Sequence, residues 1–311
     1  MGPEKAAIEG LGIKYAAVSS GKMRRYFSWQ NFLDFFRFLI GIYQAKKVLK
    51  KFGPKVVFSK GGFVSLPVTL AAKKLKIPVV LHESDVSPGL ANKWAMKTAD
   101  KICVSFEETK KYIAPNVMRR VVVTGNPVRE SILHGDRARG YSFTGLTHKK
   151  PVILIIGGSL GAMQLNELVW NSLDKLLNKF QIVHLTGRGN LKKDFSKKGY
   201  VQFEYLDKEL KDVYAISDLI VSRGGANVLF ELAMLGKKVL IIPLSHRASR
   251  GDQFDNAEVF VRKMGWGLLA GDIEKDEFIK IIDKAIKEHP HKDVTIKNGA
   301  KRIAELILSY K

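Results

Sequence analysis

The chain is poor in cysteine and in acidic residues, and both scarcities limit what it can be. Its 311 residues include one cysteine, Cys103, which excludes an internal disulfide and fits a reducing compartment. Its seven histidines form no HExxH motif, so we expect no metal site and no cofactor. Against 52 Lys and Arg there are 30 Asp and Glu, which gives a formal net charge of +22. An anionic partner is therefore expected: nucleic acid, an anionic membrane surface or a phosphate-rich substrate.

The sequence also lacks a hydrophobic run long enough to span a bilayer. The most aromatic stretch, residues 22–51, is interrupted by Asp34 and Arg37 well short of about 20 apolar residues. Basic residues flank its aromatic centre, and Asp34 is its only acid. Two interpretations stay open. The stretch is either an amphipathic helix that lies on a membrane surface or a core-facing helix with a basic outer edge.

Short β-branched runs alternate with helical periods along the chain. This alternation predicts parallel sheets with helices on both faces, and hence an α/β fold with two doubly wound domains. Residues 131–150 are polar and have no strand pattern, so we interpret them as a hinge. We assign the domains to residues 1–130 and 131–295, and expect a last helix, within residues 296–311, to return to the first domain. Strands are expected at residues 55–58, 78–81, 101–104, 120–123, 152–156, 181–185, 201–205, 219–221 and 239–242.

The first domain lacks a unit that this architecture normally has. A doubly wound domain begins with a strand, a turn and a helix, which take about 30 residues or more. This chain begins instead with a helix-like stretch that carries Pro3 near its first turn. We therefore expect the first strand–turn–helix of domain one to be absent.

Two glycine turns in the second half are the most informative pattern. The first runs from Gly157 to Gly161 after an expected strand, and the second contains Gly224 and Gly225 after another. If these strands are neighbours, two helix N-termini with free N–H groups point into one crevice, which suits a nucleotide diphosphate. Neither turn fits the dinucleotide or P-loop fingerprint. Each turn alone could serve only close packing, and Ser159 in the first favours phosphate binding because its hydroxyl can donate.

Other candidates lie near the carboxyl ends of strands, where α/β sheets bind ligands. Glu231 could bind a ribose diol or be a solvated helix glutamate, and the apolar residues around it favour burial. Arg129 could clamp a diphosphate or be a surface arginine at a linker. His82 could be a base, although a hydrogen-bonded edge histidine is the favoured interpretation. Gln253 could bind a sugar hydroxyl, and the turn at Gly61 offers backbone donors.

These segments together resemble the MurG family of bacterial glycosyltransferases, which convert lipid I to lipid II in peptidoglycan synthesis. The matching residues are 20–27, 58–65, 82–83, 88–92, 125–129, 157–162, 222–227, 231 and 248–253, in order over essentially the whole chain. The resemblance implies a GT-B fold that binds UDP-GlcNAc in its cleft, mainly on the second domain. It implies an inverting transfer of N-acetylglucosamine to a lipid-linked muramoyl-pentapeptide acceptor. It also implies a peripheral protein at the cytoplasmic face of the plasma membrane, whose helix at residues 32–43 meets the anionic membrane surface. Nucleic acid is not the expected partner, because the sequence has no recognition motif and its aromatic residues in residues 22–51 fall on one helix.

The resemblance further implies roles for single residues. Glu231 would hold the uridine ribose, Gln253 would contact the sugar hydroxyls, and the backbone of Leu206 would flank the uracil. Gly61 and Gly62 would belong to the acceptor's diphosphate site. The implied donor-binding residues are Asn92, Arg129, Ser159, Leu206, Ala226, Asn227, Val228, Leu229, Phe230, Glu231 and Gln253.

One family segment has no counterpart in this sequence. Members begin with a strand and a Gly-Gly-Thr-Gly-Gly-His turn, whose histidine is the proposed general base. His82 is not that residue, so no catalytic residue is assigned here. We expect the chain to bind UDP-GlcNAc but to transfer it weakly or not at all. A diacylglycerol glycosyltransferase of the same fold and a non-catalytic membrane subunit that binds a UDP-sugar remain alternatives.

Overall fold

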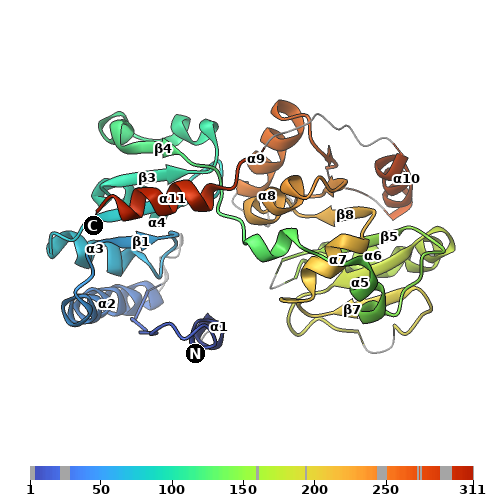
Figure 1. Cartoon of the computed structure of the whole chain (residues 1–311), viewed down its shortest axis with the longest axis horizontal. Helices are drawn as coiled ribbons and strands as arrows, with labels where there is room; N and C mark the ends of the chain where they lie inside the picture. Colours follow the sequence, from blue (N-terminus) through green and yellow to red (C-terminus); the bar gives the residue numbers. More distant parts are fainter. Residues whose placement is uncertain are drawn as a thin grey trace. The chain divides into compact units, whose positions relative to one another are not determined.

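The chain folds into two compact units, each built around a parallel sheet (Figure 1). The computed structural model describes residues 4–21, 29–158, 161–192, 195–243, 251–271, 273, 275–287 and 296–310. Unit 1 comprises Met1–Ser84, Pro88–Thr124 and Arg302–Lys311, and unit 2 comprises Asp85–Ser87 and Gly125–Lys301. In the described part of the chain, no helix is both long enough and apolar enough to cross a membrane.

Unit 1 is a four-stranded parallel sheet in the order β1-β2-β3-β4. Successive residues of a strand point to opposite faces, and both faces of this sheet are covered. On one face, Val79 and Leu81 pack against α2, α3 and α4, whereas on the other Val80 and Cys103 pack against Ile303 of α11. The elements are α1 (Glu4–Glu9), α2 (Trp29–Phe52), β1 (Val57–Ser59), α3 (Leu66–Lys74), β2 (Val79–Glu83), α4 (Leu90–Thr98), β3 (Lys101–Val104), 3₁₀ helices at Glu107–Tyr112 and Pro115–Arg120, β4 (Val121–Val123) and α11 (Gly299–Leu308).

Unit 2 is a six-stranded parallel sheet in the order β10-β9-β8-β5-β6-β7. Its central strand β5 is buried at every residue, and α6 presents an apolar face to it with the helical spacing of Leu165, Val169, Leu173 and Leu176. The elements are a 3₁₀ helix at Glu130–Leu133, α5 (Arg137–Thr144), β5 (Val152–Ile156), α6 (Met163–Lys179), β6 (Gln181–Leu185), β7 (Tyr200–Phe203), α7 (Leu210–Ile216), β8 (Leu219–Ser222), α8 (Ala226–Met234), β9 (Val239–Ile241), α9 (Asp252–Glu258), a π-helical turn at Val259–Lys263, β10 (Leu268–Leu269) and α10 (Lys275–Lys287).

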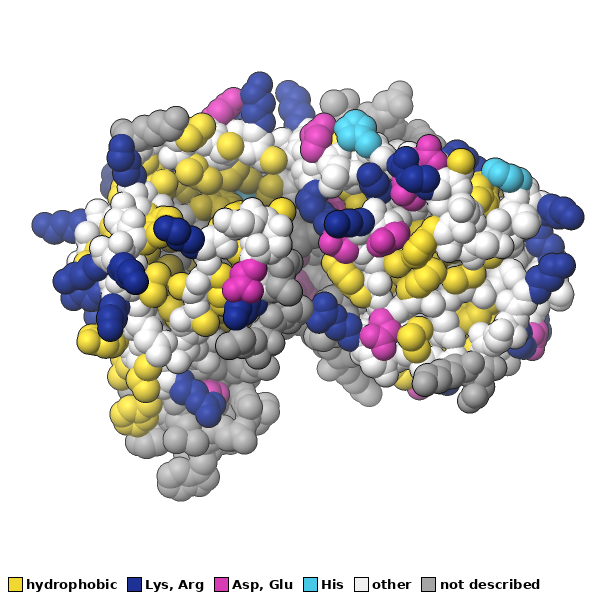
Figure 2. All heavy atoms as spheres, turned by 60° about the horizontal axis from the view of Figure 1, so that its bottom comes forward, with side chains coloured by type: hydrophobic (Ala, Val, Ile, Leu, Met, Phe, Trp, Pro, Cys, Tyr) yellow, Lys and Arg dark blue, Asp and Glu magenta, His cyan; other side chains and the backbone are white. Residues whose placement is uncertain are grey.

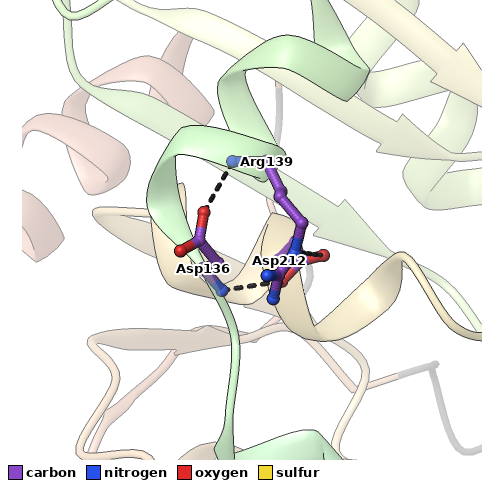
Figure 3. Close-up of polar contacts among 3 residues, drawn as sticks. All are labelled: Asp136, Arg139 and Asp212. Atoms are coloured by element: carbon purple, nitrogen blue, oxygen red, sulfur yellow. Dashed lines mark hydrogen bonds and ion pairs between the residues drawn. The ribbon is translucent and has the colours of Figure 1, made fainter.

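The stretch at residues 131–150, interpreted from the sequence as a hinge, contains helix α5 and belongs to unit 2. Asp136 caps this helix by accepting a hydrogen bond from the Arg139 backbone N–H at 2.7 Å. Asp212 of α7 then accepts from the Asp136 N–H at 2.6 Å and from two nitrogens of the Arg139 guanidinium at 3.1 Å (Figure 3). These bonds fasten α5 to α7. The Arg139 guanidinium, helped by the Asp136 N–H, holds the pKa of Asp212 below its ordinary value, although burial opposes this.

The expected strands all occur in the structure. Those at residues 101–104, 152–156 and 181–185 have the expected bounds, and the ends of the others differ by a few residues, as is usual for strand ends. Strand β10 was not predicted, because its two residues are too few to show the alternation typical of a strand. The expected last helix is α11, which begins at Gly299.

Candidate functional site

The two glycine turns follow neighbouring strands, which is the condition that the sequence analysis left open. β5 and β8 are hydrogen-bonded along their length, and their last residues, Ile156 and Ser222, are paired. The strand order also reverses here, because β6 and β7 extend the sheet on one side of β5, whereas β9 and β10 extend it beyond β8. In open α/β sheets, ligands bind beyond the carboxyl ends of the strands at this switch point. The carboxyl edge of β5 and β8 is therefore the candidate site of unit 2.

Helices α6 and α8 begin just after these turns without a side-chain cap. The residue before α6 is Ala162 and the residue before α8 is Gly225, and neither residue type has a polar side chain that could cap a helix. The first N–H groups of an α-helix have no partner within the helix, so an uncapped start can bind an anion. Ser159, the expected hydroxyl donor in the first turn, lies outside the described residues.

Arg223 joins the two turns, and sequence reasoning gave it no role. Its Nη1 donates to the carbonyl oxygens of Gly157 at 3.0 Å and Gly161 at 3.3 Å. Burial lowers the pKa of this guanidinium. Because the Arg223 guanidinium bridges both carbonyls, this residue, which directly follows β8, fixes Gly157 and Gly161 of the turn that follows β5. The sequence signal for Arg223 was its position inside the Ser222–Asn227 motif. This motif does not predict which backbone carbonyls the guanidinium contacts.

Glu231 of α8 and Arg129 are brought together in unit 2. Tyr214 donates a hydrogen bond from its hydroxyl to Glu231 Oε2 at 3.3 Å, and Arg129 donates to Asp207 Oδ1 at 2.9 Å. Burial raises the pKa of Glu231, whereas the charge of Arg129 and the Tyr214 hydroxyl lower it. The Tyr214 hydroxyl itself is buried, and this raises its pKa well above the ordinary value. The half-buried Glu231 carboxylate can accept further hydrogen bonds, as a ribose diol would require.

The first turn of α8 presents mostly backbone to a ligand. Ala226, Leu229 and Phe230 are buried and Val228 is partly buried, so their side chains pack inward. Asn227 is exposed, and its Oδ1 accepts a hydrogen bond from the buried Asn126 at 2.8 Å. This bond ties the loop that leads to Arg129 to the start of α8.

The expected uracil and sugar contacts also lie in unit 2. Leu206 is buried beside the exposed Tyr205, whose ring centroid is 5.7 Å from the Arg188 guanidinium carbon. Gln253 lies in the first turn of α9, and its Oε1 is buried without a hydrogen-bond partner among the residues that the structure describes. A buried acceptor that lacks a donor is costly, so a ligand hydroxyl at this place would be stabilising.

Unit 1 gathers the expected acceptor residues around Asn92. Asn92 Oδ1 accepts from the Gly62 N–H at 2.9 Å, and its Nδ2 donates to the buried Glu83 carboxylate at 2.6 Å. Gly61 has a φ of +86°, and a Cβ there would lie 2.2 Å from Asn92 Oδ1. Asn92 thus contacts the glycine turn of unit 1, whereas the other residues of the expected donor set belong to unit 2.

The backbone donors expected of this turn are already engaged. The Gly61 N–H donates to Ser59 Oγ at 3.1 Å, as the Gly62 N–H does to Asn92. His82 is fully buried, and its Nδ1 lies 3.2 Å from Lys60 Nζ, which agrees with the edge histidine favoured from the sequence. Lys60 also donates to Ser84 Oγ at 2.9 Å, so a cation stands at this turn.

A cavity of about 390 Å³ opens in unit 2 beside Arg223. It lies between α6, the residues after β9 and the residues after β10, and its lining includes Gln164, Glu167, Ile242 and Gly271. Within the described ranges, no cluster of three or more His, Cys, Asp or Glu side chains could hold a metal ion.

Family profiles match both parts of the chain. Residues 2–104 match the N-terminal domain of glycosyltransferase family 28, and residues 152–307 match its C-terminal domain. A relative from Clostridium botulinum (strain Loch Maree / Type A3) is 46% identical over 319 aligned positions, which cover 99% of this chain and 88% of the relative. A relative from Lachnospira eligens is 48% identical over 286 positions, which cover 91% and 80%. Both are named UDP-N-acetylglucosamine--N-acetylmuramyl-(pentapeptide) pyrophosphoryl-undecaprenol N-acetylglucosamine transferase.

Solved structures share the fold at lower identity. The MurG of Acinetobacter baumannii is 23% identical, with a TM-score of 0.67 over 99% of this chain and 89% of that one. The UDP-GlcNAc 2-epimerase of Neisseria meningitidis, solved with UDP-GlcNAc bound, is 18% identical, with a TM-score of 0.69 over 98% and 88%. At these identities the likeness concerns the architecture alone.

Proposed function

The chain belongs to glycosyltransferase family 28, and on that premise we propose that the carboxyl edge of β5 and β8 holds its sugar donor. It is a hexosyltransferase with a GT-B fold, which transfers N-acetylglucosamine from UDP-GlcNAc to a lipid-linked MurNAc-pentapeptide in peptidoglycan synthesis. The resulting questions are which residues hold the donor, which hold the acceptor and where the protein meets the membrane.

The observation that carries the donor site is the pair of uncapped helix starts at the switch point. The first N–H groups of α6 and α8 donate to the diphosphate oxygens, and Arg129 faces the same charge. As the bond from C1 to the diphosphate breaks, negative charge grows on the departing UDP. Donors that are already oriented stabilise this charge without reorganisation. Ser159 would add a hydroxyl to this set.

The remaining donor residues bind the two ends of UDP-GlcNAc. The Glu231 carboxylate accepts the two ribose hydroxyls, and Tyr214 holds it in place from behind. The backbone beside Leu206 flanks the uracil. Gln253 Oε1 accepts a hydroxyl of the N-acetylglucosamine, which supplies the donor that it lacks.

The acceptor is assigned to the turn at Gly61 and Gly62 in unit 1. Because both N–H groups already donate within the protein, the turn contributes its shape, and Lys60 contributes the positive charge that a lipid-linked diphosphate requires. Asn92 and Glu83 hold the turn in this form.

We further assign the membrane contact to an exposed apolar stripe on α2. Phe36, Leu39, Ile40 and Tyr43 follow the helical spacing and are all exposed, Tyr43 to 72%. The opposite side of α2 packs into the core through Ala45 and Leu49, as the core-facing interpretation expected, and the exposed stripe supports the membrane interpretation for the other side. The chain carries 52 Lys and Arg against 30 Asp and Glu, and Figure 2 shows Lys and Arg side chains on the surface of both units, which favours an anionic surface as partner.

The membrane assignment is tested by sedimentation with phosphatidylglycerol vesicles. A variant with Leu39→Glu and Ile40→Glu should lose most of its binding, because it places charge in the apolar stripe. Leu308→Glu is the matched control: it is also exposed, but α11 covers the opposite face of the sheet. Equal sedimentation of the double variant and the wild type would contradict the assignment.

The donor site is tested by titration calorimetry with UDP. The wild type should bind UDP, and Glu231→Ala should weaken binding by about tenfold or more, because hydrogen bonds to a charged group are lost. Glu130→Ala, which changes an exposed glutamate of the same unit, should bind like the wild type. Unchanged affinity in Glu231→Ala would refute the role given to this residue.

A further inference from the structure

Four side chains behind the first glycine turn form an unbroken chain of hydrogen bonds. Trp170 Nε1 contacts the Tyr200 hydroxyl at 3.0 Å, and this hydroxyl contacts His184 Nδ1 at 3.0 Å. His184 Nε2 contacts Asn166 Oδ1 at 3.0 Å, and Asn166 Nδ2 donates to the Thr186 carbonyl at 2.8 Å. The four side chains come from α6, β6 and β7 and are buried, His184 and Asn166 completely.

The groups at the two ends of this row of hydrogen bonds determine which atom donates and which accepts in every bond between them. A carbonyl oxygen only accepts, so the Asn166 amide turns its nitrogen to Thr186 and its oxygen to His184. His184 Nε2 must therefore carry the proton, and Nδ1 of the neutral ring accepts from the Tyr200 hydroxyl. Tyr200 in turn accepts from the indole N–H of Trp170, which only donates. The arrangement allows one tautomer and one amide orientation.

Both ionisable members stay neutral over the physiological pH range. Burial lowers the pKa of His184 to about 3 and raises that of Tyr200 to about 12. Neither group therefore changes its protonation state between these two pKa values, and the bond directions stay the same there. A buried polar chain that is fully satisfied costs desolvation but makes its surroundings rigid and specifies one arrangement.

The row of hydrogen bonds ends at the Thr186 carbonyl, next to the first glycine turn. Asn166 lies in the first turn of α6, and the Thr186 carbonyl that it contacts would be 2.1 Å from a Cβ at Gly161. Asn190 Nδ2 donates to the same carbonyl at 3.1 Å. Asn166 thus ties the start of α6 to the loop after β6, and Gly161 packs closely against the carbonyl at which this hydrogen bond ends.

We propose that His184 is a positioning residue for the sugar donor. Through Asn166 it holds the start of α6, next to Gly161, in the orientation in which the first N–H groups of this helix meet a nucleotide diphosphate. The residue touches no reacting atom and acts through the helix. This inference rests on the proposed donor site.

The test compares UDP affinity among variants of the full chain by titration calorimetry. His184→Phe keeps a ring but removes both hydrogen bonds, and should weaken UDP binding by about tenfold. His184→Gln restores one donor and one acceptor on a single amide, and should return the affinity to within about threefold of the wild type. Leu173→Ala is the matched control, since it damages the core under the same helix two turns further along. It should lower the melting temperature and leave UDP affinity unchanged.

Tyr200→Phe keeps the test decisive if His184→Phe does not fold. It deletes one oxygen and breaks the bonds to Trp170 and His184, and should weaken UDP binding by about threefold to fivefold. If the His184 and Tyr200 variants lose thermal stability but bind UDP like the wild type, the role of His184 is merely structural and the inference is overturned. If the wild type itself binds no UDP, the donor site fails, and the inference fails with it.

Discussion

Replacing His184 should change how the stability of unit 2 responds to acid. The ordinary pKa of a histidine is 6.5, whereas burial holds the pKa of His184 at about 3 in the folded protein. Between these values the unfolded chain binds a proton that the folded chain does not. The free energy of unfolding therefore falls as the pH falls from 6.5 towards 3, by about 1.4 kcal/mol per pH unit. Stability from this group is complete above pH 6.5.

The expected magnitude follows from the pH interval. At pH 5.0 the solution is about 1.5 pH units below the ordinary pKa of histidine. Acidification from pH 7.5 to 5.0 should therefore lower the free energy of unfolding by about 2 kcal/mol through His184. His184→Gln removes the titrating group but keeps a neutral donor and acceptor. It should be less stable than the wild type at pH 7.5, yet lose about 2 kcal/mol less on acidification.

The assay is urea denaturation at pH 7.5 and 5.0. A chain of two units can unfold in two steps, so the transition of unit 2 is identified as the one that Leu173→Ala shifts. All other titrating groups are common to the wild type and the variant, and their effects cancel in the difference. An equal loss of stability on acidification in the wild type and His184→Gln would refute the reasoning.

Three further predictions concern single contacts. Gln253→Ala should weaken binding of UDP-GlcNAc by about fivefold in titration calorimetry without changing the affinity for free UDP, because its amide meets the sugar; equal effects on both ligands would place it elsewhere. Gly61→Ala should weaken binding of the lipid-linked acceptor in a direct binding assay and leave UDP affinity intact, because the new Cβ would collide with Asn92; unchanged acceptor binding would show that the turn does not serve the acceptor. Asp212→Ala should destabilise unit 2 by about 1–3 kcal/mol, measured by thermal unfolding, because the Asp136 N–H loses its partner; an unchanged melting temperature would contradict this.

Much of the local structure could be predicted from the sequence, because its signals are local. The strands at residues 101–104, 152–156 and 181–185 were found with their bounds, since β-branched runs between helical periods depend on neighbours in the chain. The turn at Gly224 was found for a similar reason. Its φ of +94° suits glycine, which has no Cβ to resist it. Helix α5, which lies within residues 131–150, was not predicted because it is polar and its anchor, Asp212, lies far away in the sequence.

The carboxyl edge of β5 and β8 depends on contacts that local sequence patterns do not predict. The sequence identified both glycine turns, but only the sheet order placed β8 beside β5, a neighbour that is not consecutive in the chain. The same holds for Arg223, whose carbonyl partners at Gly157 and Gly161 belong to another strand's turn. For α2, the pattern of apolar residues could not say which side would be covered, and packing against the core left one stripe exposed.

By itself, the sequence determined the α/β class, the strands, the turns that require glycine and the likeness to a family of transferases. The tertiary structure decided which of these features meet. Asn92 lies with Gly62, the N–H groups of that turn are occupied, and His184 has one tautomer because Tyr200 and Asn166 lie on either side of it. The physical reason is that periodicity and backbone preference act between near neighbours in the chain. Hydrogen-bond partners and burial depend on segments that only folding brings together.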